Sequence, residues 1–161
     1  MAQVYLSLGS NINRQFNISE GIKTLTQHFP LLSLSSVFES EAVGFSGNAF
    51  YNLVVGFSTD KSLNEVAELC RKIEFLYGRE QNAKKYSPRT LDIDILLFDD
   101  LILTSPVQIP RDEILTNAFV LWPLSEIAAD LNHPIKKQTY AQLWHNYPKE
   151  TQKLKKVQFS F

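Results

Sequence analysis

The chain has 161 residues, 44% of them hydrophobic and 20% charged, a composition that predicts a single globular domain over residues 1–161. A formal net charge of −1 is too close to zero for the protein as a whole to attract nucleic acid electrostatically. No apolar run approaches the roughly 20 residues that are needed to span a bilayer. One cysteine excludes a disulfide framework within the chain, and MAQVYLSLGSN does not read as a signal peptide. We therefore expect a cytoplasmic monomer that acts without nucleic acid or membrane.

Hydrophobic periodicity in the first hundred residues predicts a strand, a helix, two strands, a helix and a strand, over residues 4–8, 16–29, 32–40, 50–58, 62–78 and 90–98. In the second helix Ser62 and Glu65 form a capping box, and Gly78 can close the C-terminus. Later patterns predict two short strands on either side of a turn at 104–106, and then a helical stretch over 111–131 that Pro123 interrupts. An amphipathic segment over 138–147 and a last strand over 156–161 follow. This order predicts an α+β fold with a ferredoxin-like β-α-β-β-α-β core, C-terminal additions and a sheet flanked by helices.

The predicted strand over 90–98 places two carboxylates, Asp92 and Asp94, inside an apolar run. Residues i and i+2 of a strand point to the same face, so these side chains project together while Ile93 and Ile95 face the core. Neighbouring carboxylates repel each other unless something positive lies beside them. Mg²⁺ suits this position because it is held by one or two carboxylates, water and substrate phosphates. By spacing alone, two solvated acids on a surface strand are an equally good interpretation.

A polar segment before this strand carries four basic residues, Arg79, Lys84, Lys85 and Arg89. Metal ions together with basic side chains are what a bound triphosphate needs, and the sequence has no Walker-type glycine-rich loop. We expect this segment to be mobile and to close over bound nucleotide. Composition alone favours the alternative, a solvated connector.

The stretch KYSPRTLDIDIL (85–96) resembles the signature of the 6-hydroxymethyl-7,8-dihydropterin pyrophosphokinases, enzymes of folate biosynthesis that pass a diphosphate from ATP to a pterin alcohol. Supporting matches follow in the family's order: LGSN (8–11), FYNLVV (50–55), IEFLYGR (73–79) and AFVLWPLSEIAADL (118–131). The resemblance implies a Mg²⁺-dependent diphosphotransferase whose partners are ATP and a reduced pterin, and whose products are AMP and the pterin diphosphate.

The resemblance also implies a role for each matched residue. Asp92 and Asp94 would bind two Mg²⁺ ions and, with Arg79 and Arg89, form the catalytic set. The pterin would be bound by Ser40, Val43, Phe50, Asn52 and Phe119. ATP would be bound by Arg71, Glu74, Lys85, Tyr86, Arg89, Ile95, Arg111 and Asp112. Without the resemblance, core packing is the favoured explanation for Phe50 and Phe119, whereas a buried amide such as Asn52 needs hydrogen-bond partners.

Several residues depart from the family pattern around the nucleotide. Arg111 stands where a His is expected and Asn117 where an Arg is expected, while Tyr86 and Ser87 replace the Trp and Gly of the signature. Two alternatives stay open, the first because of these differences and the second because the two aspartates can be merely solvated. One is a paralogue with a different reduced-pterin substrate, or a weakly catalytic pterin-binding protein. The other is a non-catalytic ferredoxin-like interaction module. We expect Cys70 to be a small buried residue and not a nucleophile.

Overall fold

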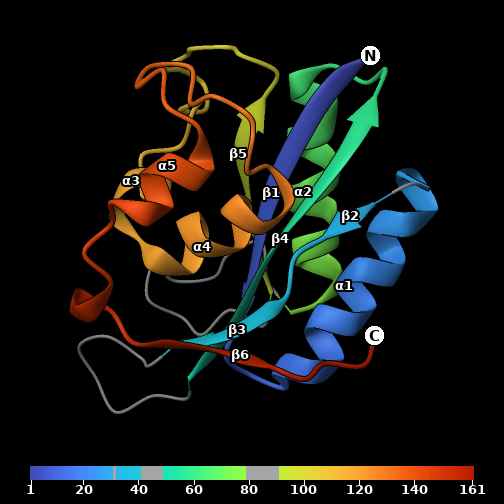
Figure 1. The fold of residues 1–161 in the computed structure, drawn as a ribbon. Coiled ribbons are helices and arrows are strands. Elements are labelled where there is room, and N and C mark those ends of the chain that lie inside the picture. Colours follow the sequence, from blue (N-terminus) through green and yellow to red (C-terminus); the bar gives the residue numbers. More distant parts are fainter. Residues whose placement is uncertain (31, 41–48, 79–90) are drawn as a thin grey trace.

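The computed structural model describes residues 1–30, 32–40, 49–78 and 91–161. The first half of the fold contains β1 (Ala2–Ser10), α1 (Arg14–His28), β2 (Ser33–Leu34), β3 (Val37–Ser40), β4 (Phe50–Thr59), α2 (Leu63–Leu76) and β5 (Asp92–Phe98). The second half contains α3 (Glu113–Thr116), α4 (Ala118–Ile127), α5 (Tyr140–His145), a 3-10 turn η1 (Lys149–Thr151) and β6 (Leu154–Val157) (Figure 1). In this part of the chain no helix is long and apolar enough to cross a membrane.

The strands form one antiparallel sheet in the order β5-β1-β4-β3-β6, and β2 also pairs with β4. Taking β2 and β3 together as one broken strand, β5-β1-β4-β3 is the arrangement of a split β-α-β core. The predicted α+β fold with a ferredoxin-like core is therefore confirmed. The C-terminal addition, β6, extends the sheet beyond β3.

The predicted strand over 32–40 is interrupted because a serine side chain enters its ladder. The main-chain N–H of Val54 donates to Oγ of Ser35 at 2.9 Å, while Ser35 N donates to Val54 O at 2.9 Å. The hydroxyl thus takes the place of a backbone acceptor at this point. As a result, β2 and β3 are two short strands along the same edge of β4.

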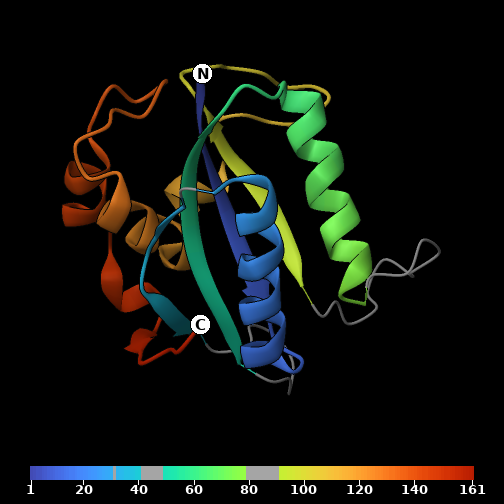
Figure 2. The same ribbon diagram turned by 90° about the vertical axis from the view of Figure 1, so that its right-hand side faces the viewer.

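Alternation along the strands gives the sheet two apolar faces. Val4, Leu6 and Leu8 of β1 pack in the cluster that includes α1 and α2, whereas Tyr5 belongs to the cluster that includes α4 and α5. Figure 2 shows α1 and α2 on one side of the sheet and the C-terminal helices on the other. This period of two decides which side chains of each strand face α4.

The capping box predicted for α2 is present. Glu65 N donates to Oγ of Ser62 at 3.2 Å, and Ser62 N donates to Oε1 of Glu65 at 2.9 Å. At the other end Gly78 follows the C-cap with a φ of 106°, a left-handed conformation that favours glycine. The residues at which α2 begins and ends are thus set by local sequence.

Three predictions for the C-terminal half are wrong in detail. α4 continues through Pro123 because burial of its neighbours outweighs the one main-chain hydrogen bond that proline cannot donate. The short strands expected around 104–106 reduce to a single bridge between Leu103 and Ile109. The last strand covers Leu154–Val157 instead of 156–161, and Phe159 packs edge-on against the ring of Tyr51.

Candidate active site

A cavity of about 270 Å³ lies on the α4 side of the sheet, at the point where several strands present small or polar residues. Its lining comes from β1, β3, β4, β5 and the α3–α4 region: Ser7, Gly9, Ser40, Phe50, Asn52, Asp92, Asp94, Glu113, Phe119 and Val120. Four residues predicted to bind the pterin are therefore brought together, namely Ser40, Phe50, Asn52 and Phe119. We call this space the ring cavity, since two aromatic rings and an amide suit a flat heterocycle.

The floor of the ring cavity is formed by Gly9 between two polar neighbours. In the sheet register Gly9 lies opposite Asn52 on β4 and opposite Asp92 on β5. Asn52 is only 5% exposed, and its Nδ2 donates to Oγ of Ser40 at 3.0 Å. A Cβ atom on Gly9 would lie 2.9 Å from Oδ1 of Asn52. The missing side chain thus leaves room for the buried amide at the bottom of the cavity.

Asp92 and Asp94 both line the ring cavity, and the residues that alternate with them, Ile93 and Ile95, are buried in the α1–α2 core. The two carboxylates therefore share a face, as the strand period predicts. Among the described residues no group of three or more His, Cys, Asp or Glu could hold a metal ion. Two carboxylates fit Mg²⁺, whose other ligands are commonly water and phosphate oxygens.

A second cavity, of about 160 Å³, lies between α2 and β5, the edge strand. It is lined by Ala67, Cys70, Arg71, Glu74, Ile93, Asp94, Ile95, Val107 and Arg111. Four predicted ATP-binding residues are among them: Arg71, Glu74, Ile95 and Arg111. Asp94 lines this edge cavity as well as the ring cavity, so one carboxylate is shared by the two spaces.

Glu74 has a structural contact inside the edge cavity. Glu74 is only 4% exposed, and its Oε2 accepts a hydrogen bond from the main-chain N–H of Ile93 at 2.9 Å. Because β5 is an edge strand, this carboxylate takes the place of a neighbouring strand as acceptor. It ties α2 to β5 at the residue between the two aspartates, and so helps to fix their position.

Cys70 lies on the same helix face as Glu74 and is buried, as expected from the sequence. Burial, and after it the carboxylates of Glu74 and Asp94, raises the pKa of the Cys70 thiol to about 12. The thiol therefore stays protonated at neutral pH and is not a nucleophile.

The departures at positions 111 and 117 are connected through one carboxylate, Glu113. Nε of Arg111 contacts Oε1 of Glu113 at 2.8 Å, and Nδ2 of Asn117 donates to Oε2 at 2.9 Å. Nη2 of Arg111 lies 3.7 Å from Oδ1 of Asp94. The arginine thus stands beside the shared aspartate, and Glu113 holds it there.

Sequence reasoning missed four residues of the ring cavity, Ser7, Gly9, Glu113 and Val120. The first two alternate with the buried Leu6 and Leu8, so the same period of two that selected Asp92 and Asp94 could have found them. Glu113 gave no such signal, because α3 has only four residues and shows no periodic face.

Some predicted site residues are not placed in either cavity. Asp112 is the N-cap of α3 and is not among the lining residues, so its contact with ATP stays a prediction. Val43, Arg79, Lys85, Tyr86 and Arg89 lie outside the described residues.

A larger hollow of about 720 Å³ beside the start of α1 contains groups that already interact with one another. Nη2 of Arg14 lies 2.8 Å from Oε2 of Glu39, and its guanidinium carbon lies 3.9 Å from the centre of the Tyr51 ring. These contacts fasten α1 to β3 and β4, so the chemistry is better sought at the ring and edge cavities.

Comparison with known proteins identifies the family of this chain. The family model described as 7,8-dihydro-6-hydroxymethylpterin-pyrophosphokinase (HPPK) matches residues 5–129. The chain belongs to the HPPK family. A relative from Aquifex aeolicus, 2-amino-4-hydroxy-6-hydroxymethyldihydropteridine pyrophosphokinase, is 35% identical over 141 residues, covering 86% of this chain and 88% of the relative. The protein of that name from Bacillus subtilis is 36% identical over 128 residues, with 76% of each chain covered.

The fold is also shared with solved structures. The crystal structure of Plasmodium falciparum HPPK-DHPS with SDX-DHP superposes with a TM-score of 0.68 at 16% identity, covering 91% of this chain. This chain spans 44% of that longer protein. At such low identity the match concerns the fold alone.

Proposed function

We propose that this protein transfers a diphosphate group from ATP to 6-hydroxymethyl-7,8-dihydropterin, a step in folate biosynthesis. The observation that carries the proposal is that Asp94 lines two adjoining cavities, one suited to a flat ring and one containing the predicted nucleotide residues. Family membership supports the same activity, since relatives at 35% and 36% identity bear the name of this pyrophosphokinase.

In this proposal the pterin occupies the ring cavity. Phe50 and Phe119 flank the flat ring system, and Asn52 supplies amide groups for hydrogen bonds to its polar edge. Because Nδ2 of Asn52 donates to Ser40, the orientation of that amide is already set before a ligand enters. This preorganisation reduces the ordering that binding requires.

ATP binds at the edge cavity with its phosphates directed towards Asp94. Asp92 and Asp94 would hold two Mg²⁺ ions, which when bound neutralise phosphate charge during transfer. Arg111 stands at the same carboxylate and can contact phosphate oxygens, while Glu113 keeps its guanidinium oriented. Arg79 and Arg89 are proposed to assist from the segment before β5.

The transfer itself forms one bond and breaks one. The hydroxymethyl oxygen attacks the β-phosphorus in line, the bond from that phosphorus to the oxygen bridging it to the α-phosphorus breaks, and AMP leaves with that oxygen. One of the two aspartates is proposed to accept the hydroxyl proton, directly or through water. Catalysis comes mainly from holding the two substrates in register and from stabilising charge.

A second candidate is a paralogue that prefers another reduced pterin. The ring cavity of this chain contains the carboxylate of Glu113, and the residue at 117 is the neutral Asn117 instead of the expected arginine. Acidic lining of this kind favours a ring substituent that can donate hydrogen bonds. Competition between hydroxymethyldihydropterin and other reduced pterins would distinguish the two candidates.

The proposed reaction is tested by identifying the nucleotide product. With ATP, Mg²⁺ and hydroxymethyldihydropterin the protein should release AMP, and release of ADP alone would contradict the mechanism. Asp92→Ala should abolish turnover, whereas Asp100→Ala, an exposed acid just beyond the same strand, should leave it unchanged. Calorimetry should show nucleotide binding that depends on Mg²⁺; its absence would favour the non-catalytic interaction module.

The remaining expectations stay predictions: a single domain over residues 1–161, a monomer, a cytoplasmic location, and no nucleic-acid or membrane partner. Size-exclusion chromatography with light scattering would check the monomer.

A further inference from the structure

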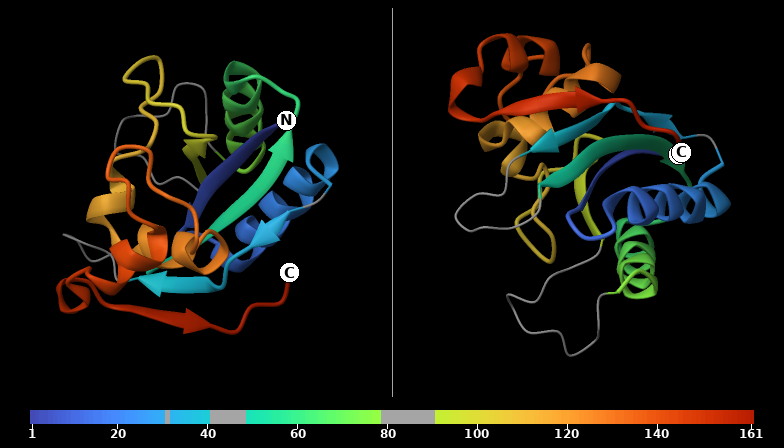
Figure 3. Two further views of the ribbon diagram at one scale, coloured as in Figure 1. Left: turned by 45° about the horizontal axis from the view of Figure 1, so that its top comes forward. Right: turned by 90° about the horizontal axis from the view of Figure 1, so that it is seen from below.

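The C-terminal segment lies beyond the part of the chain that the family model matches, which ends at residue 129. Residues 147–157, here called the C-terminal brace, contain η1 and β6. Figure 3 shows β6 running beside β3, with the chain reaching it from the α5 side. The brace therefore lies against elements that form the ring cavity, although none of the side chains described in it lines that cavity.

One contact of the brace is at the start of α4. The main-chain N–H of Ala118, the first residue of α4, donates to Oε1 of Gln152 at 2.6 Å. Nε2 of Gln152 donates in turn to Thr116 O at 3.0 Å, and the Tyr147 hydroxyl donates to the same carbonyl at 2.7 Å. The brace thus holds the main chain on both sides of Asn117, immediately before Phe119.

Gln152 acts as the N-terminal cap that α4 does not receive from its own residue. Asn117 is the N-cap position, yet its side chain makes no cap hydrogen bond and is directed to Glu113. The first N–H groups of a helix have no partner within the helix and need an outside acceptor. A residue 34 positions further along the chain supplies that acceptor to Ala118.

The second contact of the brace is with β3, the strand that carries Ser40. β6 pairs with β3 in a register that sets Leu154 opposite Ser40 and Lys155 opposite Glu39, with Lys155 Nζ 3.4 Å from Oε1 of Glu39. Without β6, the strand that carries Ser40 would be the sheet edge. The brace therefore supports both Phe119 and Ser40, from two sides.

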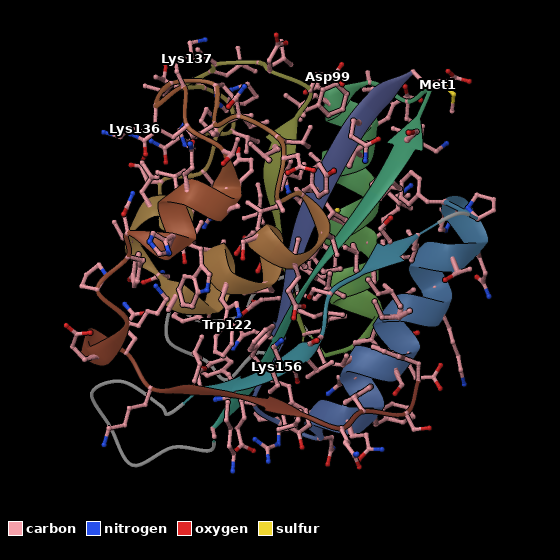
Figure 4. All side chains as sticks on the ribbon, viewed as in Figure 1. Met1, Asp99, Trp122, Lys136, Lys137 and Lys156 are labelled. Carbon is pink, nitrogen blue, oxygen red and sulfur yellow. The ribbon has the colours of Figure 1, made fainter. Side chains whose placement is uncertain are left out.

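The far end of the brace is itself anchored on α4. Lys156 Nζ lies 2.9 Å from Oε2 of Glu126 and 5.5 Å from the ring centre of Trp122. Figure 4 shows Lys156 and Trp122 near each other where β6 passes α4. With its contacts at both ends of α4, the brace fixes where this helix lies against β3.

We propose that Gln152 is a positioning residue for the pterin site: by capping α4 it holds Phe119 at the ring cavity. The inference rests on the proposed function, because it assigns Phe119 to a bound pterin. It predicts that loss of the cap weakens pterin binding selectively, since Phe119 is in the first turn of α4, whereas the edge cavity is built from α2, β5 and the segment before α3.

The test compares two glutamines that both accept a main-chain hydrogen bond at a helix N-terminus. Gln152→Ala removes the cap of α4. Gln142→Ala removes the capping box of α5, in which Thr139 N donates to Oε1 of Gln142 at 3.0 Å, and serves as the matched control. The dissociation constant of hydroxymethyldihydropterin is measured with Mg²⁺ and a saturating non-hydrolysable ATP analogue, and that of the analogue is measured separately.

Gln152→Ala should raise the pterin dissociation constant about tenfold, the size expected for loss of a helix cap, and leave that of the analogue within about twofold. Gln142→Ala should change neither. Gln152→Glu keeps an acceptor for Ala118 N but loses the donor to Thr116 O, so it should restore only part of the affinity. Equal pterin affinities in the two alanine variants, or equal weakening of pterin and nucleotide by Gln152→Ala, would overturn the proposal.

Hydrogen exchange of the first turn of α4 separates this inference from the proposed function. In the ligand-free protein, amides at the start of α4 should exchange faster in Gln152→Ala than in the parent or in Gln142→Ala. If Gln152→Ala exchanged faster but the parent protein bound no pterin, the proposed function would be refuted while the capping role of Gln152 would stand. Unchanged exchange would refute the cap itself.

Discussion

Substitution of Gly9 by alanine offers a direct test of how the ring cavity is built. The new methyl group would lie 2.9 Å from Oδ1 of Asn52, closer than carbon and oxygen atoms normally approach, and 3.8 Å from the carbonyl oxygen of Tyr51, an ordinary contact. The strain therefore falls on the amide. Because Asn52 is buried and donates to Ser40, it cannot move aside without disturbing that hydrogen bond.

The expected effect follows from the hydrogen bonds that the Asn52 amide is proposed to make to the pterin. Each is worth about 0.5–1.5 kcal/mol, so misplacing two of them costs about 1–3 kcal/mol. This corresponds to a rise of roughly 5-fold to 150-fold in the pterin dissociation constant. The affinity for the ATP analogue should stay the same, because neither Gly9 nor Asn52 lines the edge cavity.

The assay is a double-mutant cycle on pterin binding, with Gly9→Ala measured in the parent and in an Asn52→Ala background. Once the amide is gone, the added methyl group has no atom to displace, so Gly9→Ala should have little further effect. If the substitution weakened pterin binding by the same factor in both backgrounds, the contact with Asn52 would not be the cause and the reasoning would fail.

Three further predictions concern stability. Glu74→Ala should lower the free energy of unfolding by about 1–3 kcal/mol, because it leaves the Ile93 N–H buried without its acceptor; an unchanged urea midpoint would contradict this. Burial, followed by the charge of Lys136, lowers the pKa of His133, whose Nδ1 accepts two main-chain hydrogen bonds at 3.1 Å. The neutral His133 side chain should therefore contribute its full share of the folding stability above the ordinary pKa of 6.5. That share should be lost as the pH falls through the lowered pKa of the folded protein. The Tm measured against pH should show this loss, and a His133→Gln variant should not. Among the described residues the buried Tyr140 hydroxyl has no hydrogen-bond partner, so Tyr140→Phe should keep or raise the Tm, and a clear fall would reveal a missed partner.

Local sequence was sufficient for features that depend on backbone geometry within one element. The shared face of Asp92 and Asp94 follows from the strand period of two, and the capping box of α2 follows from the spacing of Ser62 and Glu65. Alternation also gave the strand order along the chain, and with it the fold class. It failed at 32–40, where the pattern is that of a continuous strand but a Ser35 hydroxyl replaces a backbone partner.

Only the tertiary structure decided which groups meet at the site. Nothing in the sequence indicates that Glu74 completes the edge of β5, that Glu113 joins Arg111 to Asn117, or that Gln152 caps α4. Periodicity records which face of an element is buried, but not which element covers it. Those contacts depend on how the helices and strands pack together. They join residues that are distant along the chain, or residues in segments too short to show a periodic pattern.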